Sequence, residues 1–258
     1  MKKRPLGATG MEVSPLGLGT TKFGRNQQLK YASDFELPSD REIEELLDIA
    51  GSAGVNLIDT APAYGLAEER LGKLIKVPED WLIVTKAGEE FEAGRSRFDF
   101  TPAAIRASVE RSRRRLRRDR LDIVLLHSDG NDVDIIQNSA ALNALYELKH
   151  QGLIGAVGVS TKTVAGGLLA VAVCDVVMVT MNQGYRNEVP VIRAAERSNK
   201  GILVKKPLDS GRHDDPAASL AAVLAEPGVA CAVTGTIDRD HLRQNCDSAS
   251  RVNQGADR

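Results

Sequence analysis

Short apolar segments alternate with amphipathic segments along most of the chain. Runs of four to six mostly apolar residues occupy positions 55–58, 82–85, 123–126, 154–159, 176–181, 202–205 and 229–233. After each run, apolar residues recur every three or four positions, as they do on one face of an α-helix. The predicted helices are 67–75, 101–116, 138–150, 164–173, 190–198, 216–225 and 239–249.

The N-terminal part adds one more unit of the same kind. Residues 6–10 and 11–15 predict a small hairpin, and residues 16–20 predict the first interior strand. A polar loop follows over residues 21–38. Ser39 can cap a helix that carries Ile43, Leu46 and Leu47 on one face and ends at Gly51. The chain thus contains about eight strand-then-helix units.

The predicted strands are apolar throughout, which is typical of a parallel sheet covered on both faces. Such a sheet can stay open and doubly wound, or it can close into a (β/α)₈ barrel. The regular alternation, the number of units and the length of 258 residues favour the barrel. We therefore predict one (β/α)₈ TIM-barrel domain over residues 1–258, with a short N-terminal β-hairpin.

Three of the predicted strands end at polar groups. The strand 55–58 is followed by Asp59, and Tyr64 lies in the next loop. Lys86 and His127 end two later strands. Barrel enzymes place their chemistry at the C-terminal ends of the strands, so we expect these four side chains to face one site. Each of them taken singly is more often a satisfied buried polar group, but the set favours catalysis.

Composition narrows the possible partners. The net charge of −1 gives no overall attraction to nucleic acid or to an anionic membrane. No apolar run is long enough to span a membrane, and no apolar segment of a signal peptide follows the charged N-terminus. The three cysteines have no metal-site spacing and are an odd number, which predicts reduced thiols. We expect a soluble cytoplasmic protein without a metal site.

Tyr64 and Lys86 together suit proton transfer to a carbonyl oxygen. A free phenol has a pKa near 10, about three units too high for efficient donation at neutral pH. A neighbouring ammonium lowers that pKa, and Asp59 on the next strand can hold Lys86 charged. His127 can bind a substrate oxygen or share the proton transfer. No side chain supplies a hydride, so carbonyl reduction here implies a nicotinamide cofactor.

Several motifs resemble those of the aldo-keto reductase family. They are Asp59-Thr-Ala-Pro-Ala-Tyr-Gly65, Thr85-Lys-Ala-Gly88 and Leu126-His-Ser-Asp-Gly130, with weaker matches over nearly the whole chain. The resemblance implies an NAD(P)H-dependent reductase of aldehydes or ketones. In such an enzyme Tyr64 is the proton donor, Lys86 and Asp59 tune it, and His127 orients the substrate.

The same resemblance implies a set of cofactor contacts. They are Thr20, Ser160, Gln183, Lys205, Pro207, Leu208, Gly235, Thr236, Arg239, His241, Arg243 and Asn245. Lys205 occupies the place of the tyrosine that stacks on the nicotinamide in this family. The segment from Gly235 into the last helix resembles an adenosine-phosphate site, where a helix N-terminus favours an anion. NADPH is the preferred cofactor, and NADH remains an alternative.

Other functions compete with this interpretation. Lys86 could form a Schiff base, as lysines in aldolase-like lyases do. The arginine-rich segment 111–120 could bind nucleic acid, but its apolar stripe and the absence of interleaved aromatics favour a solvated helix face. Phe91, Phe98 and Phe100 could line a substrate pocket or pin their loop. A cofactor-binding sensor or regulatory subunit on the same scaffold is the alternative from another class.

The expected partner is therefore a small-molecule carbonyl substrate, with neither nucleic acid nor membrane. The sequence is compatible with a monomer and with a homo-oligomer, and it does not name the aldehyde or ketone.

Overall fold

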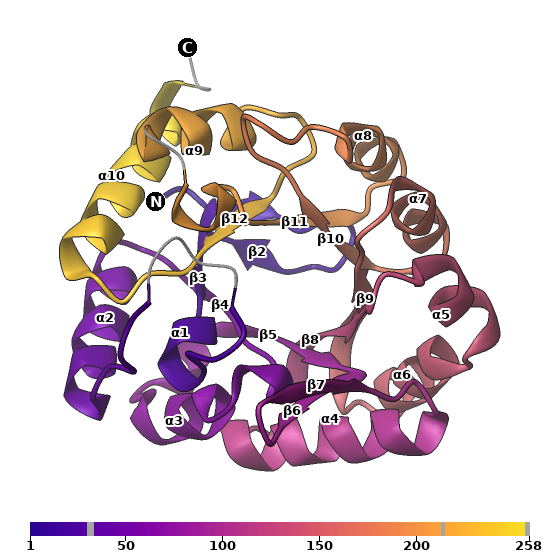
Figure 1. Cartoon of the computed structure of the whole chain (residues 1–258). Coiled ribbons are helices and arrows are strands. Elements are labelled where there is room, and N and C mark those ends of the chain that lie inside the picture. Colours follow the sequence, from indigo (N-terminus) through magenta and orange to yellow (C-terminus); the bar gives the residue numbers. More distant parts are fainter. Residues whose placement is uncertain (30–33, 213–214, 256–258) are drawn as a thin grey trace.

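Eight parallel strands form a closed barrel in the computed structural model, which describes residues 1–29, 34–212 and 215–255. Each strand pairs with the next, and β12 pairs with β3 to close the ring (Figure 1). Closure excludes the open doubly wound sheet and confirms the (β/α)₈ prediction. The strands are β3 (Leu16–Gly19), β4 (Leu57–Asp59), β5 (Leu82–Ala87), β8 (Leu121–His127), β9 (Ile154–Ser160), β10 (Val176–Thr180), β11 (Gly201–Lys205) and β12 (Cys231–Thr234).

Helices surround the barrel (Figure 1). Ser39 caps α2 (Asp40–Ser52) with a complete capping box, and the side chains of Thr101, Thr163 and Asp215 cap three other helices. The main helices are α2 (Asp40–Ser52), α3 (Ala67–Leu74), α4 (Pro102–Leu116), α6 (Ala141–His150), α7 (Val164–Val173), α8 (Val189–Arg197), α9 (Pro216–Leu224) and α10 (Arg239–Gly255). Among the described residues, no helix is long and apolar enough to cross a membrane.

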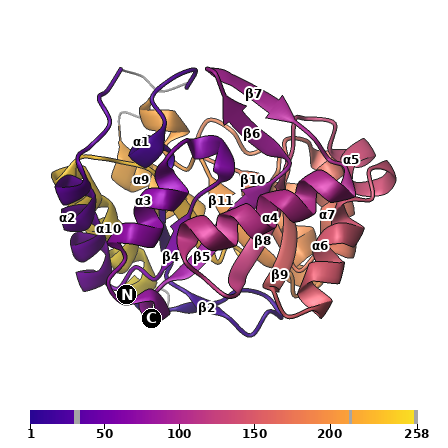
Figure 2. The same ribbon diagram turned by 90° about the horizontal axis from the view of Figure 1, so that it is seen from below.

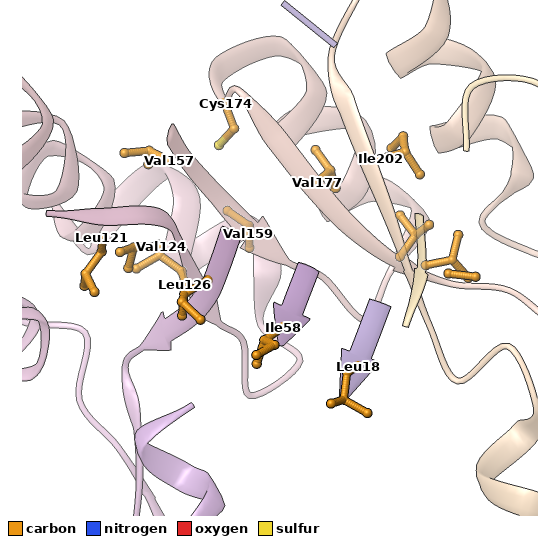
Figure 3. Packing of buried hydrophobic residues seen from close by; sticks show 14 of the residues in the cluster. Leu18, Ile58, Leu121, Val124, Leu126, Val157, Val159, Cys174, Val177 and Ile202 are labelled. Atoms are coloured by element: carbon orange, nitrogen blue, oxygen red, sulfur yellow. The ribbon is translucent and has the colours of Figure 1, made fainter. Parts of the chain in front are cut away.

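Two hydrophobic cores arise because side chains along a strand alternate between the two faces of the barrel wall. Residues such as Ile58, Val124 and Val157 point outward and pack with helix residues (Figure 3). Residues such as Leu57 and Leu125 point inward and pack only with other strands and the N-terminal hairpin. The interior of the barrel is therefore a filled core.

The same alternation decides which polar groups face the C-terminal mouth of the barrel. Asp59 lies two positions after the inward-pointing Leu57, and Lys86 lies two positions after Val84. His127 follows Leu125, and Lys205 follows Leu203, at the same spacing. An even spacing keeps a side chain on the same face of a strand. All four side chains therefore lie on the inward face of the barrel wall and point into the same space at its mouth.

Two small hairpins lie at opposite ends of the barrel (Figure 2). The first pairs β1 (Arg4–Pro5) with β2 (Glu12–Val13) and confirms the predicted N-terminal hairpin, with residues 6–10 in the connection between its strands. The second pairs β6 (Glu89–Glu92) with β7 (Arg95–Phe98), in a segment for which a loop was predicted. This second hairpin lies between β5 and α4, at the end that carries the polar groups.

Two helical segments also differ from the prediction. The predicted helix 138–150 begins three residues later, as α6, because Ala140 before it adopts a left-handed conformation with φ of 56°. A separate helix that was not predicted, α5 (Asp132–Asn138), precedes it. The short helix α1 (Thr21–Gly24) begins the segment predicted as a polar loop.

The arginine-rich helix α4 packs as its apolar stripe predicts. Ile105, Val109 and Leu116 are buried against the barrel. Its arginines form ion pairs, including Arg113 with Glu110 at 2.7 Å and Arg115 with Glu69 at 3.1 Å. These carboxylates compete with any external polyanion for the arginines.

Buried helix residues that pack against the outward face of the strands should contribute strongly to the stability of the barrel. We expect Leu145→Ala, in the fully buried face of α6, to lower the free energy of unfolding by about 2–5 kcal/mol. Leu168→Ala, in α7 and 42% exposed, is the matched control and should lower it much less. Urea unfolding of the two variants measures both values. Equal losses would contradict the assignment of the core.

Candidate active site

A buried ion pair joins two neighbouring strands at the mouth of the barrel. Lys86 Nζ donates to Asp59 Oδ1 at 2.5 Å and to the carbonyl oxygen of Thr60 at 2.9 Å. The side chains of Lys86 and Asp59 are only 1% and 7% exposed. Burial alone favours the neutral amine, but Asp59 and Tyr64 together outweigh it and raise the pKa of Lys86 above its usual value. Lys86 is therefore a charged ammonium, a state that does not form a Schiff base.

Tyr64 lies directly beside this pair. It ends the short helix η1 (Pro62–Tyr64) that follows β4, and Lys86 Nζ lies 4.8 Å from the centre of its ring. Gly24 and Gly65 hold this turn in place by close backbone contact, since a Cβ atom on Gly65 would lie 2.2 Å from the Gly24 oxygen. The turn therefore has little freedom to move away from Lys86.

Burial raises the pKa of Tyr64 to about 12, although Lys86 acts in the opposite direction. We expected Lys86 to bring this pKa below 10. The direction of its effect is as expected, but desolvation of the phenolate is larger, and the charge of Asp59 opposes Lys86. The phenol of Tyr64 is thus protonated at neutral pH in this structure and is available as a hydrogen-bond donor.

His127 closes the group from the next strand, β8. Its ring lies edge-on to Tyr64, with ring centres 6.2 Å apart and an interplanar angle of 86°. Its Nδ1 atom lies 2.8 Å from Oε2 of Glu89, a residue of the β6–β7 hairpin. Burial lowers the pKa of His127, although Glu89 acts in the opposite direction. The structure therefore brings Asp59, Tyr64, Lys86 and His127 together, and it adds Glu89.

Lys205 lies at the same mouth, across from these residues. Its Nζ donates to Ser160 Oγ at 2.9 Å and to the carbonyl oxygen of Thr161 at 2.5 Å. Burial lowers the pKa of Lys205 to about 8, although Glu188 acts in the opposite direction. Two residues predicted to hold the cofactor, Lys205 and Ser160, thus contact each other directly.

The predicted phosphate site lies at the start of α10. The Asp238 carboxylate already accepts the backbone N–H groups of Asp240 and His241, both at 2.8 Å. Arg239 pairs with Glu45 at 2.5 Å, and Arg243 pairs with Asp240 at 2.9 Å. Each predicted basic contact therefore has a carboxylate nearby, and a bound phosphate would compete with it.

The other predicted cofactor contacts differ in their surroundings. The hydroxyl and the N–H of Thr20 both donate to the backbone oxygen of Asp59, so Thr20 connects β3 with β4. Gln183 and Gly235 are exposed, whereas Asn245 is buried in α10. The remaining members of the set are Pro207, which is buried, and Leu208 and Thr236, which are partly buried.

Glu89 is the residue of the site that sequence reasoning missed. Residues 89–92 and 95–98 are separated by Ala93-Gly94, both with positive φ, which is the signature of a two-residue hairpin turn. Only Gly94 of this turn could be recognised in the sequence, since alanine rarely adopts a positive φ. The same hairpin carries Phe91, whose ring lies 3.6 Å from the guanidinium carbon of Arg25, and this contact favours the role of pinning the segment.

A family model supplies the identity that the geometry suggests. Residues 15–215 match the model of the aldo/keto reductase family. The chain belongs to the aldo/keto reductase family. The resemblance and the fold prediction are thereby confirmed.

Other aldo/keto reductases are similar over much of this chain. A crystal structure of an aldo-keto reductase from Pseudomonas aeruginosa has a TM-score of 0.89 and 54% sequence identity, and covers 97% of this chain and 95% of its own. The D-threo-aldose 1-dehydrogenase of a Pseudomonas species is 30% identical over 79% of this chain and 68% of its own length. The NADH-specific methylglyoxal reductase of Escherichia coli is 33% identical over 61% of this chain and 51% of its own length.

Removing the charge of Asp59 in this aldo/keto reductase should leave Lys86 buried without a counter-ion. We expect Asp59→Asn to lower the free energy of unfolding by about 3–5 kcal/mol, as for other broken buried pairs. Asp48→Asn, which breaks an exposed pair with Lys76 at 3.7 Å, is the matched control and should change it by about 0–1 kcal/mol. Urea unfolding near pH 7 measures both losses of unfolding free energy. Similar losses would show that the buried pair contributes no more to stability than the exposed pair.

Proposed function

We propose that this protein reduces the carbonyl group of an aldehyde or ketone with a nicotinamide cofactor, and that Tyr64 donates the proton. The observation that carries the proposal is the contact between Tyr64 and the Lys86–Asp59 pair, with His127 edge-on to the same phenol. Bound at the mouth, the reduced cofactor supplies a hydride to the carbonyl carbon. Membership of the aldo/keto reductase family supports this reaction type.

The side chains of the mouth supply the proton and the orientation. Tyr64 hydrogen-bonds the carbonyl oxygen and gives it a proton as negative charge develops there. The Lys86 ammonium stabilises the phenolate left behind, because it is fixed beside the ring and held charged by Asp59. His127 contacts the substrate from the other side of Tyr64. The products are an alcohol and the oxidised cofactor.

The mouth offers hydrogen-bonding groups that suit a polar cofactor. Ser160 lies four positions after the inward-pointing Ala156, and Lys205 lies two positions after Leu203, so both face the mouth. A hydroxyl and an ammonium can donate hydrogen bonds to the oxygens of a dinucleotide. Ser160, Lys205 and the start of α10 would hold the polar parts of the cofactor.

Names of relatives support a reversible exchange between carbonyl and alcohol. One relative is named as a dehydrogenase of D-threo-aldoses and another as a methylglyoxal reductase. The three cysteines are free and buried, which supports a reducing compartment, and we propose the cytoplasm. NADPH is the proposed cofactor, with NADH as the alternative because the basic groups of α10 are paired.

A cofactor-binding sensor is the second candidate function. The contact between Lys205 and Ser160 favours it, since the ammonium occupies a hydroxyl otherwise available to the nicotinamide. A sensor would bind NADPH tightly and show no turnover with a broad panel of aldehydes and ketones. Measured turnover above background would exclude it.

Loss of the phenolic hydroxyl should remove the proton donor. We expect Tyr64→Phe to lower kcat for aldehyde reduction by roughly 10²–10⁴-fold, while cofactor affinity stays unchanged. Tyr146→Phe, in α6 outside the mouth, is the matched control and should retain its activity. Cofactor oxidation at 340 nm, with fluorescence titration of the cofactor, gives both values. Normal turnover in Tyr64→Phe would remove Tyr64 from this role.

The basic groups of α10 should act only on the phosphate that distinguishes NADPH from NADH. We expect Arg243→Ala to raise the Kd for NADPH about tenfold and to leave the Kd for NADH unchanged. Arg251→Ala, on an exposed later turn of the same helix, is the control and should change neither. An equal change for both cofactors in Arg243→Ala would place the phosphate elsewhere.

A further inference from the structure

Lys205 is a second lysine at the mouth, and the proposed proton transfer does not use it. It ends β11, and its even spacing from Leu203 turns the side chain inward. Its Nζ atom donates to Ser160 Oγ at 2.9 Å and to the carbonyl oxygen of Thr161 at 2.5 Å. Both acceptors are uncharged. Among the residues that the structure describes, therefore, no carboxylate neutralises this ammonium by direct contact.

The carboxylates on this side of the mouth are bound to backbone groups instead. Glu188 precedes α8, and its Oε1 accepts the N–H of the last residue of β10 at 3.2 Å. Asp132 Oδ2 accepts the N–H groups of Lys162 and Thr163, which follow β9, at 2.9 and 2.7 Å. These hydrogen bonds fix both carboxylates at the ends of strands. Lys205 thus lies near negative charge without forming an ion pair.

The surroundings of Lys205 favour its neutral amine. Burial lowers the pKa of Lys205 to about 8, the charges of Lys206, Lys86 and Lys162 act in the same direction, and Glu188 opposes them. Near pH 8, about half of the molecules then carry the amine without its extra proton. A neutral amine has a free lone pair and can attack a carbonyl carbon, as lysines that form Schiff bases do.

The two lysines of the mouth therefore differ in reactivity. Lys86 is held charged by Asp59 at 2.5 Å, so its nitrogen has no lone pair to offer. The Schiff-base chemistry that the sequence suggested for Lys86 suits Lys205 instead. The side chain of Lys205 is only partly buried, so a small molecule at the mouth can reach it.

We propose that Lys205 is a nucleophile that captures small aldehydes as an imine at the mouth of the barrel. The ammonium first gives one proton to water. The Nζ lone pair then attacks the carbonyl carbon, a C–N bond forms, and the π electrons of the C=O bond move to the oxygen, which takes a proton from Nζ. Uptake of one proton from water releases that oxygen as water while the C=N bond forms. In sum, the aldehyde and the ammonium give a protonated imine and one water, without oxidation or reduction.

Ser160 is the neighbour that can assist this step. Its hydroxyl lies 2.9 Å from Nζ and can donate a hydrogen bond to the oxygen of the tetrahedral intermediate. The captured aldehyde then occupies the space beside Ser160 and Lys205 in which we place part of the cofactor. Imine formation and cofactor binding therefore exclude each other. The proposal rests on the carbonyl-binding mouth of the proposed function and adds a covalent reaction of the aldehyde there.

Reductive trapping tests the imine without turnover. Sodium cyanoborohydride converts an imine to a stable secondary amine. We expect propanal and cyanoborohydride near pH 8, without cofactor, to modify Lys205 about tenfold faster than the exposed Lys76, because Lys205 carries more neutral amine. Peptide mass spectrometry follows each site separately, including the α-amino group of Met1, which also reacts with aldehydes. Equal rates at Lys205 and Lys76 would overturn the proposal.

Cofactor binding before and after trapping tests the position of the captured aldehyde. Trapping should abolish NADPH binding in the wild type, as measured by fluorescence titration. Lys205→Arg keeps the positive charge but forms no imine, so its affinity for NADPH should be the same before and after the treatment. Lys76→Met is the matched control and should lose binding as the wild type does. The same loss in Lys205→Arg would overturn the proposal.

The two proposals can fail separately. Failure to reduce any aldehyde or ketone with NADPH or NADH would count against the proposed reductase, while preferential trapping at Lys205 would still support the nucleophile. Normal reduction without preferential trapping would leave the reductase in place and remove Lys205 from this role.

Discussion

The buried pair of Lys86 and Asp59 is the interaction on which the site depends. Two charges withdrawn from water are unfavourable unless their geometry and hydrogen bonds compensate. Here the barrel supplies both, because β4 and β5 are neighbours in register and the Thr60 carbonyl accepts a further bond from the ammonium. The pair then presents a fixed positive charge to Tyr64. A flexible surface lysine could not do this, since solvent would screen it.

In the proposed reaction, the opposing effects on Tyr64 suit a donor that is used and restored in each cycle. Desolvation keeps the phenol protonated in the resting site, and the ammonium stabilises the phenolate after the proton has left. The charge of Asp59 opposes the ammonium, so the protonated phenol is the resting state. The pKa of Tyr64 is therefore set by two opposing physical causes, burial and the charge of the neighbouring ion pair.

Much of this arrangement could be predicted from the sequence. Asp59, Lys86 and His127 follow apolar runs at the even spacing that keeps them inside the barrel, so strand periodicity alone brings them together. Lys205 was predicted as a site residue only through the family resemblance. Its even spacing from the inward-pointing Leu203 explains why its side chain also faces the mouth. The net pKa of Tyr64 could not be predicted, because desolvation depends on how tightly Gly24 and Gly65 pack around the turn. The capping carboxylate of Asp238 was missed because loop geometry decides which oxygen reaches a helix N-terminus.

The β6–β7 hairpin takes no part in closing the barrel, yet it supplies the partner of His127. Its own turn and the ring of Phe91 under Arg25 hold it in place. Its sequence can therefore vary without disturbing the strands that define the fold. In this scaffold, a segment beside the mouth and the strands that define the fold are separate parts of the polypeptide, so the first can be re-engineered while the second is kept.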